Sequence, residues 1–172
     1  MALPRAPDAA GKIEFTGVPT VRRQIEVSGL DNGHYVKELR YNGAPLADEF
    51  VPLDSAAVGH SLTVVIDDKP AIVMGSVTIG DKPVRQPYVL LVKWPPRVDW
   101  PIQTLGAAGD DKGRFQFAGL APGEYRILAL RSRDEETYRA AGTLERALAE
   151  AKKIDLSPNA LQSVGIELSE LR

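Results

Sequence analysis

Residues 109–130 read GDDKGRFQFAGLAPGEYRILAL, and this stretch decides the fold. Two aspartates precede Lys112 and Gly113, which is typical of a tight turn. Carboxylates there accept backbone N–H groups, and glycine adopts positive φ without strain. Phe115 and Phe117 are two residues apart, so they would share one face of a strand and point into a core. The first half therefore predicts a turn followed by a half-buried strand.

The second half of the stretch predicts another turn and another strand. Pro122 and Gly123 form a pair that favours a type II turn. Tyr125 follows at a place where its ring can lie at the edge of a sandwich while its hydroxyl bonds to the backbone. Tyr125 begins the segment YRILAL (125–130), which has the composition of a strand.

A related phrase, GKIEFTGVP, occupies residues 11–19. An offset of 102 aligns Gly11 with Gly113 and Gly17 with Gly119. A rival offset of 90 pairs SGLDNGHY with AGLAPGEY, but turn chemistry alone can produce that echo. We prefer the first alignment, because it preserves the alternation. Only ten residues precede Gly11, so we expect the first module to lack its opening strands and the chain to be a fragment of a longer array.

Short segments with period-two alternation, separated by Gly, Asn and Pro turns, predict a mainly β chain of tandem antiparallel β-sandwiches. The expected strands are KIEF (12–15), RRQIEVS (22–28), YVKELRY (35–41), LTVVI (62–66), AIVMGSVTI (71–79), PYVLLVKW (87–94), RFQFA (114–118), YRILAL (125–130), KIDLS (153–157) and SVGIELSEL (163–171). Asn-Gly pairs at 32–33 and 42–43 predict tight turns.

One stretch departs from this pattern. Residues 132–153 are rich in Ala, Leu, Glu and Lys, and their apolar residues recur at three- and four-residue spacing. We expect a helix near 132–152 that lies on the sandwich by its apolar stripe. The predicted organisation is a flexible lead-in over 1–11, a β-rich and incomplete sandwich module over 12–69, and a second β-sandwich with this helical excursion over 70–172.

The second module resembles the carboxypeptidase regulatory-like domain, a transthyretin-like (prealbumin-like) β-sandwich. Three pieces carry the resemblance in order over residues 71–131: the hairpin GSVTIGDKPVRQPYVLLVKWPP (75–96), the acidic turn GDDKGRFQF (109–117) and the strand entry GLAPGEYRILAL (119–130). The resemblance implies a non-enzymatic module of a secreted or cell-envelope protein. Fold resemblance by itself names no ligand.

Composition excludes several classes of function. The formal net charge is -2, and Lys and Arg do not cluster, which disfavours nucleic-acid binding. The chain has no cysteine, so disulfides, thiol catalysis and Cys-ligated zinc are excluded. No apolar run approaches the roughly 20 residues of a membrane-spanning helix. The first residues, MALPRAPDAAG, contain no apolar signal core.

The candidate sites are few. His34 and His60 are the two histidines, and neither has partners at metal-ligand spacing. Asp110 and Asp111, with Asp81, offer oxygens to calcium, although an ordinary turn explains them better. No Gly-x-Ser-x-Gly nucleophile elbow occurs in the chain. We therefore expect no catalytic residue, no metal and no cofactor.

The most distinctive loop is KWPPRVDWP (93–101). Trp94 and Trp100, with Arg97 between them, are the candidate ligand- or partner-binding residues. Alternatively, these rings cap the sandwich. We expect a structural and interaction module that contacts neighbouring domains or envelope proteins, without nucleic acid or a membrane span. The alternative is a carbohydrate-binding accessory domain that uses the Trp94/Trp100 loop to bind a polysaccharide.

Overall fold

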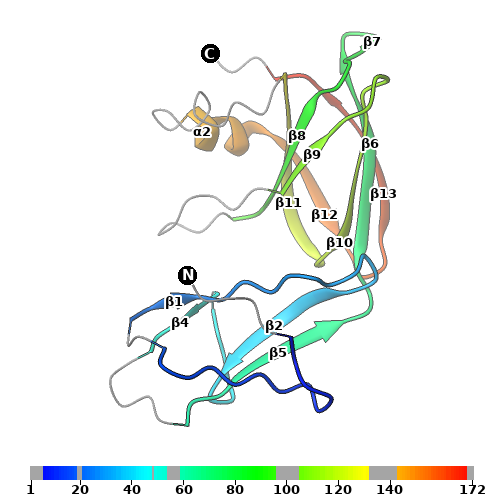
Figure 1. The fold of residues 1–172 in the computed structure, drawn as a ribbon. Coiled ribbons are helices and arrows are strands. Elements are labelled where there is room, and N and C mark those ends of the chain that lie inside the picture. The colour runs from blue at the N-terminus through cyan, green and yellow to red at the C-terminus, as the bar shows by residue number, and fades with distance from the viewer. Residues whose placement is uncertain are drawn as a thin grey trace. The chain divides into compact units, whose positions relative to one another are not determined.

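The computed structural model describes residues 6–18, 21–47, 49–53, 59–95, 105–131 and 143–169 (Figure 1). The protein is mainly β, and α2 is the one helix within these ranges. The chain forms two compact units. Unit 1 comprises residues 1–27 and 38–64, and unit 2 comprises residues 28–37 and 65–172.

The first part of the chain contains two longer strands, of seven and six residues, and three strands of two residues. A two-stranded sheet pairs β1 (Arg23–Gln24) with β4 (Phe50–Val51), and a three-stranded sheet has the order β3 (Ala44–Pro45), β2 (Tyr35–Tyr41), β5 (Leu62–Asp67). Asn42 and Gly43 connect β2 to β3 with φ values of 49° and 82°. Two successive positive φ angles are the mark of a type I′ hairpin turn. The predicted turn at 42–43 is therefore present.

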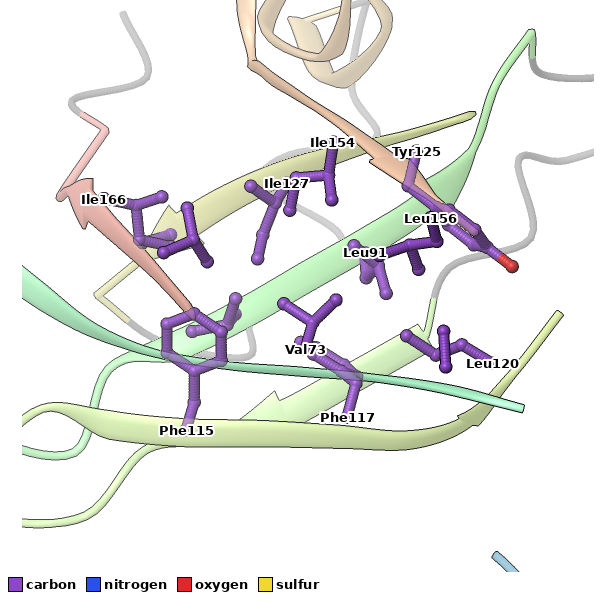
Figure 2. Packing of buried hydrophobic residues seen from close by; sticks show 14 of the residues in the cluster. Val73, Leu91, Phe115, Phe117, Leu120, Tyr125, Ile127, Ile154, Leu156 and Ile166 are labelled. Carbon is purple, nitrogen blue, oxygen red and sulfur yellow. The ribbon is translucent and has the colours of Figure 1, made fainter. Parts of the chain in front are cut away.

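Unit 2 contains two four-stranded sheets. Its strands are β6 (Ala71–Ile79), β7 (Lys82–Pro83), β8 (Tyr88–Lys93), β9 (Leu105–Ala108), β10 (Arg114–Leu120), β11 (Gly123–Leu130), β12 (Lys152–Leu156) and β13 (Leu161–Glu167). One sheet has the order β10-β6-β13 with β7 paired to β6, and the other has the order β12-β11-β8-β9. Side chains from both sheets meet between them, so unit 2 is a β-sandwich (Figure 2).

The core between the sheets is made by alternate residues of each strand. Figure 2 shows Phe115 and Phe117 of β10 pointing toward Leu91 and Ile127 of the opposite sheet. The two phenylalanines are 5% and 7% exposed, with ring centroids 6.0 Å apart and planes at 63°. Aromatic pairs favour this edge-to-face arrangement. The predicted core face of this strand is confirmed.

The outer face of the second sheet has a hydrophobic cluster of its own. The helix α2 (Thr143–Glu150) places Leu144 and Leu148 against Leu90, Val92, Leu128 and Leu130. Strand β8 is consequently buried on both faces, because its alternate residues, Val89 and Leu91, face the central core. A strand that is covered on both faces has a continuous run of apolar residues. The sequence YVLLV (88–92) is such a run.

The helix is shorter at its C-terminus than predicted. It ends at Glu150, and Lys152 already begins β12. Pairing with β11 takes over here, since Ile127 lies opposite Lys152 and Tyr125 lies opposite Ile154. Residues 132–142 lie outside the described ranges. Within the described residues, no helix is long and apolar enough to cross a membrane.

Several strand predictions differ from the structure, and the two-residue strands β3, β4 and β7 were not predicted. KIEF (12–15) is not a strand, so that prediction is wrong. Of residues 22–28, only Arg23–Gln24 forms a strand. Strand β9 was not predicted, because LGAA has no alternation. Alternation shows that a segment is able to form a strand, but a strand also needs a partner at its edge.

The predicted antiparallel architecture has one exception. Strand β13 joins β6 in parallel, whereas the other pairs of known register in unit 2 are antiparallel. The turn at Ser157–Ala160 carries the chain from one sheet to the other, with the Ala160 N–H donating to the Ser157 carbonyl at 3.1 Å. The chain then runs beside β6 in the same direction.

Candidate functional site

Trp94 lies at the end of β8, beside the hydrophobic cluster beneath α2. Its side chain is half-buried, and the Arg126 guanidinium carbon lies 4.9 Å from the centroid of its ring. A cation over an indole face is an attractive contact. Its backbone N–H donates to the Glu124 carbonyl at 2.8 Å. Trp94 is therefore held by β11, with one ring face covered by Arg126.

Arg126 is itself fixed by neighbouring strands. Its Nη1 donates to the Ala151 carbonyl at 3.2 Å, and its Nη2 lies 3.5 Å from Oε1 of Glu124. The buried Nε has no hydrogen-bond partner within the described residues. The guanidinium thus connects Trp94, which follows β8, to Ala151, which precedes β12.

Charged residues continue across β11 and β12. Register places Glu124 opposite Asp155 and Arg126 opposite Lys153, so like charges face each other directly. Such pairs are unfavourable, and Lys153 relieves the first of them by lying diagonally between the acids. Its Nζ is 2.9 Å from Glu124 and 3.5 Å from Asp155. The hydrogen bond to Glu124 is the main reason that the pKa of Lys153 is raised.

The predicted set of Trp94, Arg97 and Trp100 is described only at Trp94. Arg97 and Trp100 lie outside the described residues. No sequence pattern indicates the contact of Trp94 with Arg126, because Arg126 is far from it in the chain and is brought close by the pairing of β8 with β11. A ligand role for this loop stays a prediction.

The acidic turn before β10 is built around Asp110. Its Oδ1 accepts the backbone N–H groups of Lys112 at 2.8 Å and Arg114 at 2.9 Å, while its Oδ2 accepts from Nε of Arg114 at 2.8 Å. These bonds, led by the one from the Arg114 backbone, lower the pKa of Asp110. Asp111 accepts from Nε2 of Gln86 at 3.0 Å. Both carboxylates are therefore engaged in holding the turn.

The repeated phrase has the same turn in its first copy. Asp8 stands 102 residues before Asp110, and its Oδ1 accepts the N–H groups of Ala10 at 2.9 Å and Lys12 at 2.8 Å. Gly11 and Gly113 have φ values of 77° and 75°. The values at Gly17 and Gly119 are 66° and 68°. The sequence alignment began at Gly11 and missed Asp8, which offset 102 places on Asp110.

The histidines take part in local contacts. Nδ1 of His34 lies 2.7 Å from Oδ1 of Asp31, and this hydrogen bond lowers the pKa of the carboxyl group. Nδ1 of His60 lies 2.5 Å from the Tyr41 hydroxyl, and the two rings stack at 5.3 Å. Within the described ranges, no group of three or more His, Asp or Glu side chains is placed to hold a metal ion.

Tyr125 occupies the position that the sequence predicts. Its ring is 4% exposed in the central core, and its hydroxyl donates to the Ala121 carbonyl at 2.7 Å. Burial, with a smaller contribution from Tyr35, raises the pKa of Tyr125 to about 12. This contact joins the start of β11 to the turn before it, as a tyrosine corner does.

The first and last strands of the sandwich form its longest ladder. Strands β6 and β13 are paired from Ile72 and Leu161 to Thr78 and Glu167. The ladder is closed at one end by the Asn159 N–H donating to the Lys69 carbonyl at 3.1 Å. At the other end, the Leu168 N–H donates to the Thr78 carbonyl at 2.9 Å. The chain therefore enters β6 and leaves β13 at opposite ends.

Comparison with known proteins gave no family model that matches the chain. No curated protein matches it either. Among solved structures, it is similar to a DUF3823 family protein from Parabacteroides merdae, with 14% identity and a TM-score of 0.37 over 60% of this chain and 47% of that one. It is also similar to BcpA, the major pilin subunit of Bacillus cereus, with 12% identity and a TM-score of 0.41 over 80% of this chain and 57% of that one.

A D312A form of BcpA matches with 10% identity and a TM-score of 0.40, over 83% of this chain and 58% of the pilin. The chain thus spans about half the length of these structures. The assignment of unit 2 as a β-sandwich rests on the two packed sheets described above.

Proposed function

We propose that the chain is a non-enzymatic structural module of a larger secreted or cell-envelope protein, which spaces neighbouring domains and contacts them. The parallel ladder of β6 and β13 carries this proposal. The chain enters at one end of the ladder and leaves at the other, so its attachment points before β6 and after β13 are held apart. Nine residues of β6 at about 3.3 Å each correspond to a separation of about 30 Å.

A spacer must also be rigid, and the packing of unit 2 supports this. The central core contains fifteen buried hydrophobic residues from both sheets. The cluster beneath α2 buries seven more on the outer face of the second sheet. The second sheet is therefore packed on both of its faces. Such packing resists deformation, because each buried side chain is held by close neighbours.

The remaining parts of the proposal come from the sequence. The domain organisation, with a lead-in over 1–11 and modules over 12–69 and 70–172, stays a prediction. The location outside the cell or in the envelope rests on the resemblance to the carboxypeptidase regulatory-like domain. The proposed partners are the neighbouring domains or other envelope proteins.

Spin labels at the two ends of the ladder test the proposal. The chain has no cysteine, so Lys69→Cys with Glu167→Cys gives two defined and exposed attachment points. We expect a single narrow distance distribution near 30 Å by double electron–electron resonance. A broad distribution in the folded protein would overturn the proposed spacing role. Lys69→Cys with Leu161→Cys is the matched control, and it should give a much shorter distance.

The carbohydrate-binding alternative has a direct test. Arg126 covers one face of Trp94, whereas stacking on a sugar requires an open face. A ligand that binds the folded state raises the melting temperature through mass action. We expect no shift with a panel of polysaccharides. A shift that disappears in Trp100→Ala would favour the carbohydrate-binding role over the structural one.

A further inference from the structure

The ladder between β6 and β13 joins the strand where unit 2 begins its sandwich to the strand where it ends. Seven residue pairs run in register from Leu161 and Ile72 to Glu167 and Thr78. Bonds at both ends, from the Asn159 N–H to the Lys69 carbonyl and from the Leu168 N–H to the Thr78 carbonyl, show that the ladder extends over the whole of β13. The pairing is parallel.

Parallel pairing decides how tension acts on this ladder. When the start of β6 and the end of β13 are pulled apart, the force runs along both strands. The hydrogen bonds then share the load and must break together. If the same strands were pulled apart from one shared end, the bonds would break one at a time. Shared loading withstands the larger force, because forced unfolding is governed by the height of the unfolding barrier.

We propose that the β6–β13 ladder is a mechanical clamp that keeps unit 2 folded when the chain is pulled between residue 69 and residue 168. This inference rests on the proposed spacing function, since a spacer in a larger protein transmits tension between its neighbours. If the ladder is a clamp, the force needed to unfold unit 2 depends on the direction of pulling and is set by this one pair of strands.

Side chains resist sliding of the two strands. Val164 and Ile166 of β13 are buried with Val73 and Val77 of β6 in the central core, so a shift along the ladder would move packed groups. Gly75 of β6 lets β13 approach closely. A Cβ atom placed on Gly75 would lie 1.9 Å from the Val164 carbonyl oxygen. Sliding by one residue would also reverse which face of β13 is buried.

The end of the clamp is also tied to the second sheet. Leu168 forms an isolated parallel bridge with Ala129 of β11. The Ser169 N–H donates to the Ala129 carbonyl at 2.9 Å. Tension that leaves through residue 169 is therefore transferred to both sheets before it reaches the ladder.

Single-molecule force spectroscopy with two pulling directions tests the clamp in the full chain. The pair Lys69→Cys and Glu167→Cys loads the ladder in shear, because these residues lie at opposite ends. The pair Lys69→Cys and Leu161→Cys loads the same ladder from one end. All three side chains are exposed, so the substitutions leave the core unchanged. At equal pulling speed, we expect at least a twofold higher unfolding force in shear. Equal forces in the two directions would overturn the clamp.

A pair of proline variants locates the resistance. The Leu168 N–H donates to the Thr78 carbonyl, and the Ala160 carbonyl accepts from the Ile72 N–H at 2.8 Å. Because residues of a parallel strand alternate in direction, these bonds place the N–H of even-numbered residues of β13 toward β6. Gln162→Pro removes a ladder bond, whereas Ser163→Pro removes an N–H that faces away from β6. We expect the shear force to fall in the first variant and to stay within a fifth of the wild-type value in the second. A fall of similar size in both would place the resistance outside the ladder.

The two proposals fail in different ways. A broad distance distribution between residues 69 and 167 would overturn the spacing function whatever the forces are. A narrow distribution with equal unfolding forces in the two directions would overturn the clamp and leave the spacing function standing.

Discussion

Asp110 shows how much one exposed carboxylate can organise at the scale of a residue. It accepts three hydrogen bonds from Lys112 and Arg114 and fixes the chain immediately before β10. Asp8 accepts two equivalent backbone bonds in the first copy of the phrase. Aspartate is common in turns because its short side chain reaches backbone N–H groups two to four residues ahead.

Replacing Asp110 by Ala should therefore destabilise unit 2 in a pH-dependent way. The pKa of the folded Asp110 lies below its ordinary value. Its contribution is present in full above the unfolded pKa of about 3.9, and it is lost as the pH falls through the folded pKa. We expect the urea midpoint of Asp110→Ala to be lower than that of the wild type at pH 7. The difference between the two midpoints should narrow as the pH falls below about 4, where the carboxylate begins to lose its charge.

Asp110→Asn separates charge from hydrogen bonding. The amide oxygen still accepts from the backbone of Lys112 and Arg114, so this variant should lie between the wild type and Asp110→Ala at pH 7. Unfolding curves at pH 7, 5 and 3 provide the measurement. A difference between the wild type and Asp110→Ala that is the same at all three pH values would contradict the assigned role of the carboxylate.

The Tyr125 hydroxyl provides a second prediction at this scale. Tyr125→Phe keeps the buried ring and removes one hydrogen bond to the Ala121 carbonyl. A single hydrogen bond contributes about 1 kcal/mol, and we expect a loss of that size in the free energy of unfolding at pH 7. The pKa of Tyr125 is raised to about 12, so the wild type should lose stability as the pH rises from about 10 toward 12.

The phenylalanine variant should lack this part of the alkaline loss. Denaturant titrations of both proteins at pH 8 and pH 11 check this expectation. If Tyr125→Phe is as stable as the wild type at pH 8, the hydroxyl contact contributes nothing to folding.

Residue-scale features were predictable where both partners lie close together in sequence. The contacts of Asp110 and the hydroxyl contact of Tyr125 join residues within four positions of each other, so local chemistry identifies them. The contact of Arg126 with Trp94 depends on the register between β8 and β11. Nothing in the sequence near either residue encodes that register.

At the scale of elements, the close approach of β6 and β13 depends on Gly75. A Cβ atom there would also lie 2.8 Å from Cζ of Phe115, in addition to its overlap with the Val164 carbonyl. Overpacking a fitted core costs about 1–3 kcal/mol, and sometimes more. We expect Gly75→Ala to lower the free energy of unfolding by at least that amount.

Gly165→Ala is the matched control on the neighbouring strand. It is paired with Ser76, and a Cβ atom on it would have no neighbour within 4 Å. Its stability should stay within about 0.5 kcal/mol of the wild type. Urea denaturation followed by tryptophan fluorescence gives both values. Equal effects of the two substitutions would show that the strands are not packed as described.

Helix α2 is attached by very few side chains, and Leu148 is the most buried of them at 0% exposed. Truncating such a leucine costs about 2–5 kcal/mol because it removes contacts and leaves a cavity. We expect Leu148→Ala to fall in this range, while Arg146→Ala, on the exposed face of the same helix, should change stability by less than about 0.5 kcal/mol. A small effect of Leu148→Ala would mean that α2 is not docked on the sheet in solution.

Elements were predictable from sequence where burial imposed a pattern. The predicted bounds of YVKELRY and AIVMGSVTI coincide with β2 and β6, because each strand has a clear apolar face. Strand β9 was missed since its four residues are small and its position is set by pairing with β8. The end of α2 was predicted too late because Lys and Ala near 151–153 suit a helix as well as they suit a strand.

At the scale of the whole molecule, one phrase is used twice with different outcomes. In unit 2, residues 114–120 form β10, which pairs with β6. In unit 1, residues 12–16 follow the same kind of turn but are not part of a strand. The sequence predicted a strand for both copies, because alternation is visible locally and the presence of an adjacent strand is not.

Hydrogen exchange can test this difference in one experiment on the intact chain. Backbone amides in a ladder exchange only when the structure opens, so central strands are protected most. We expect the slowest exchange in β6, β8 and β11, which have neighbours on both sides. Residues 114–117 should exchange at least roughly tenfold more slowly than residues 12–15, which are their counterparts at offset 102. If the two copies were protected equally, residues 12–15 would be paired in solution, and the first module would contain the strand that its sequence predicts.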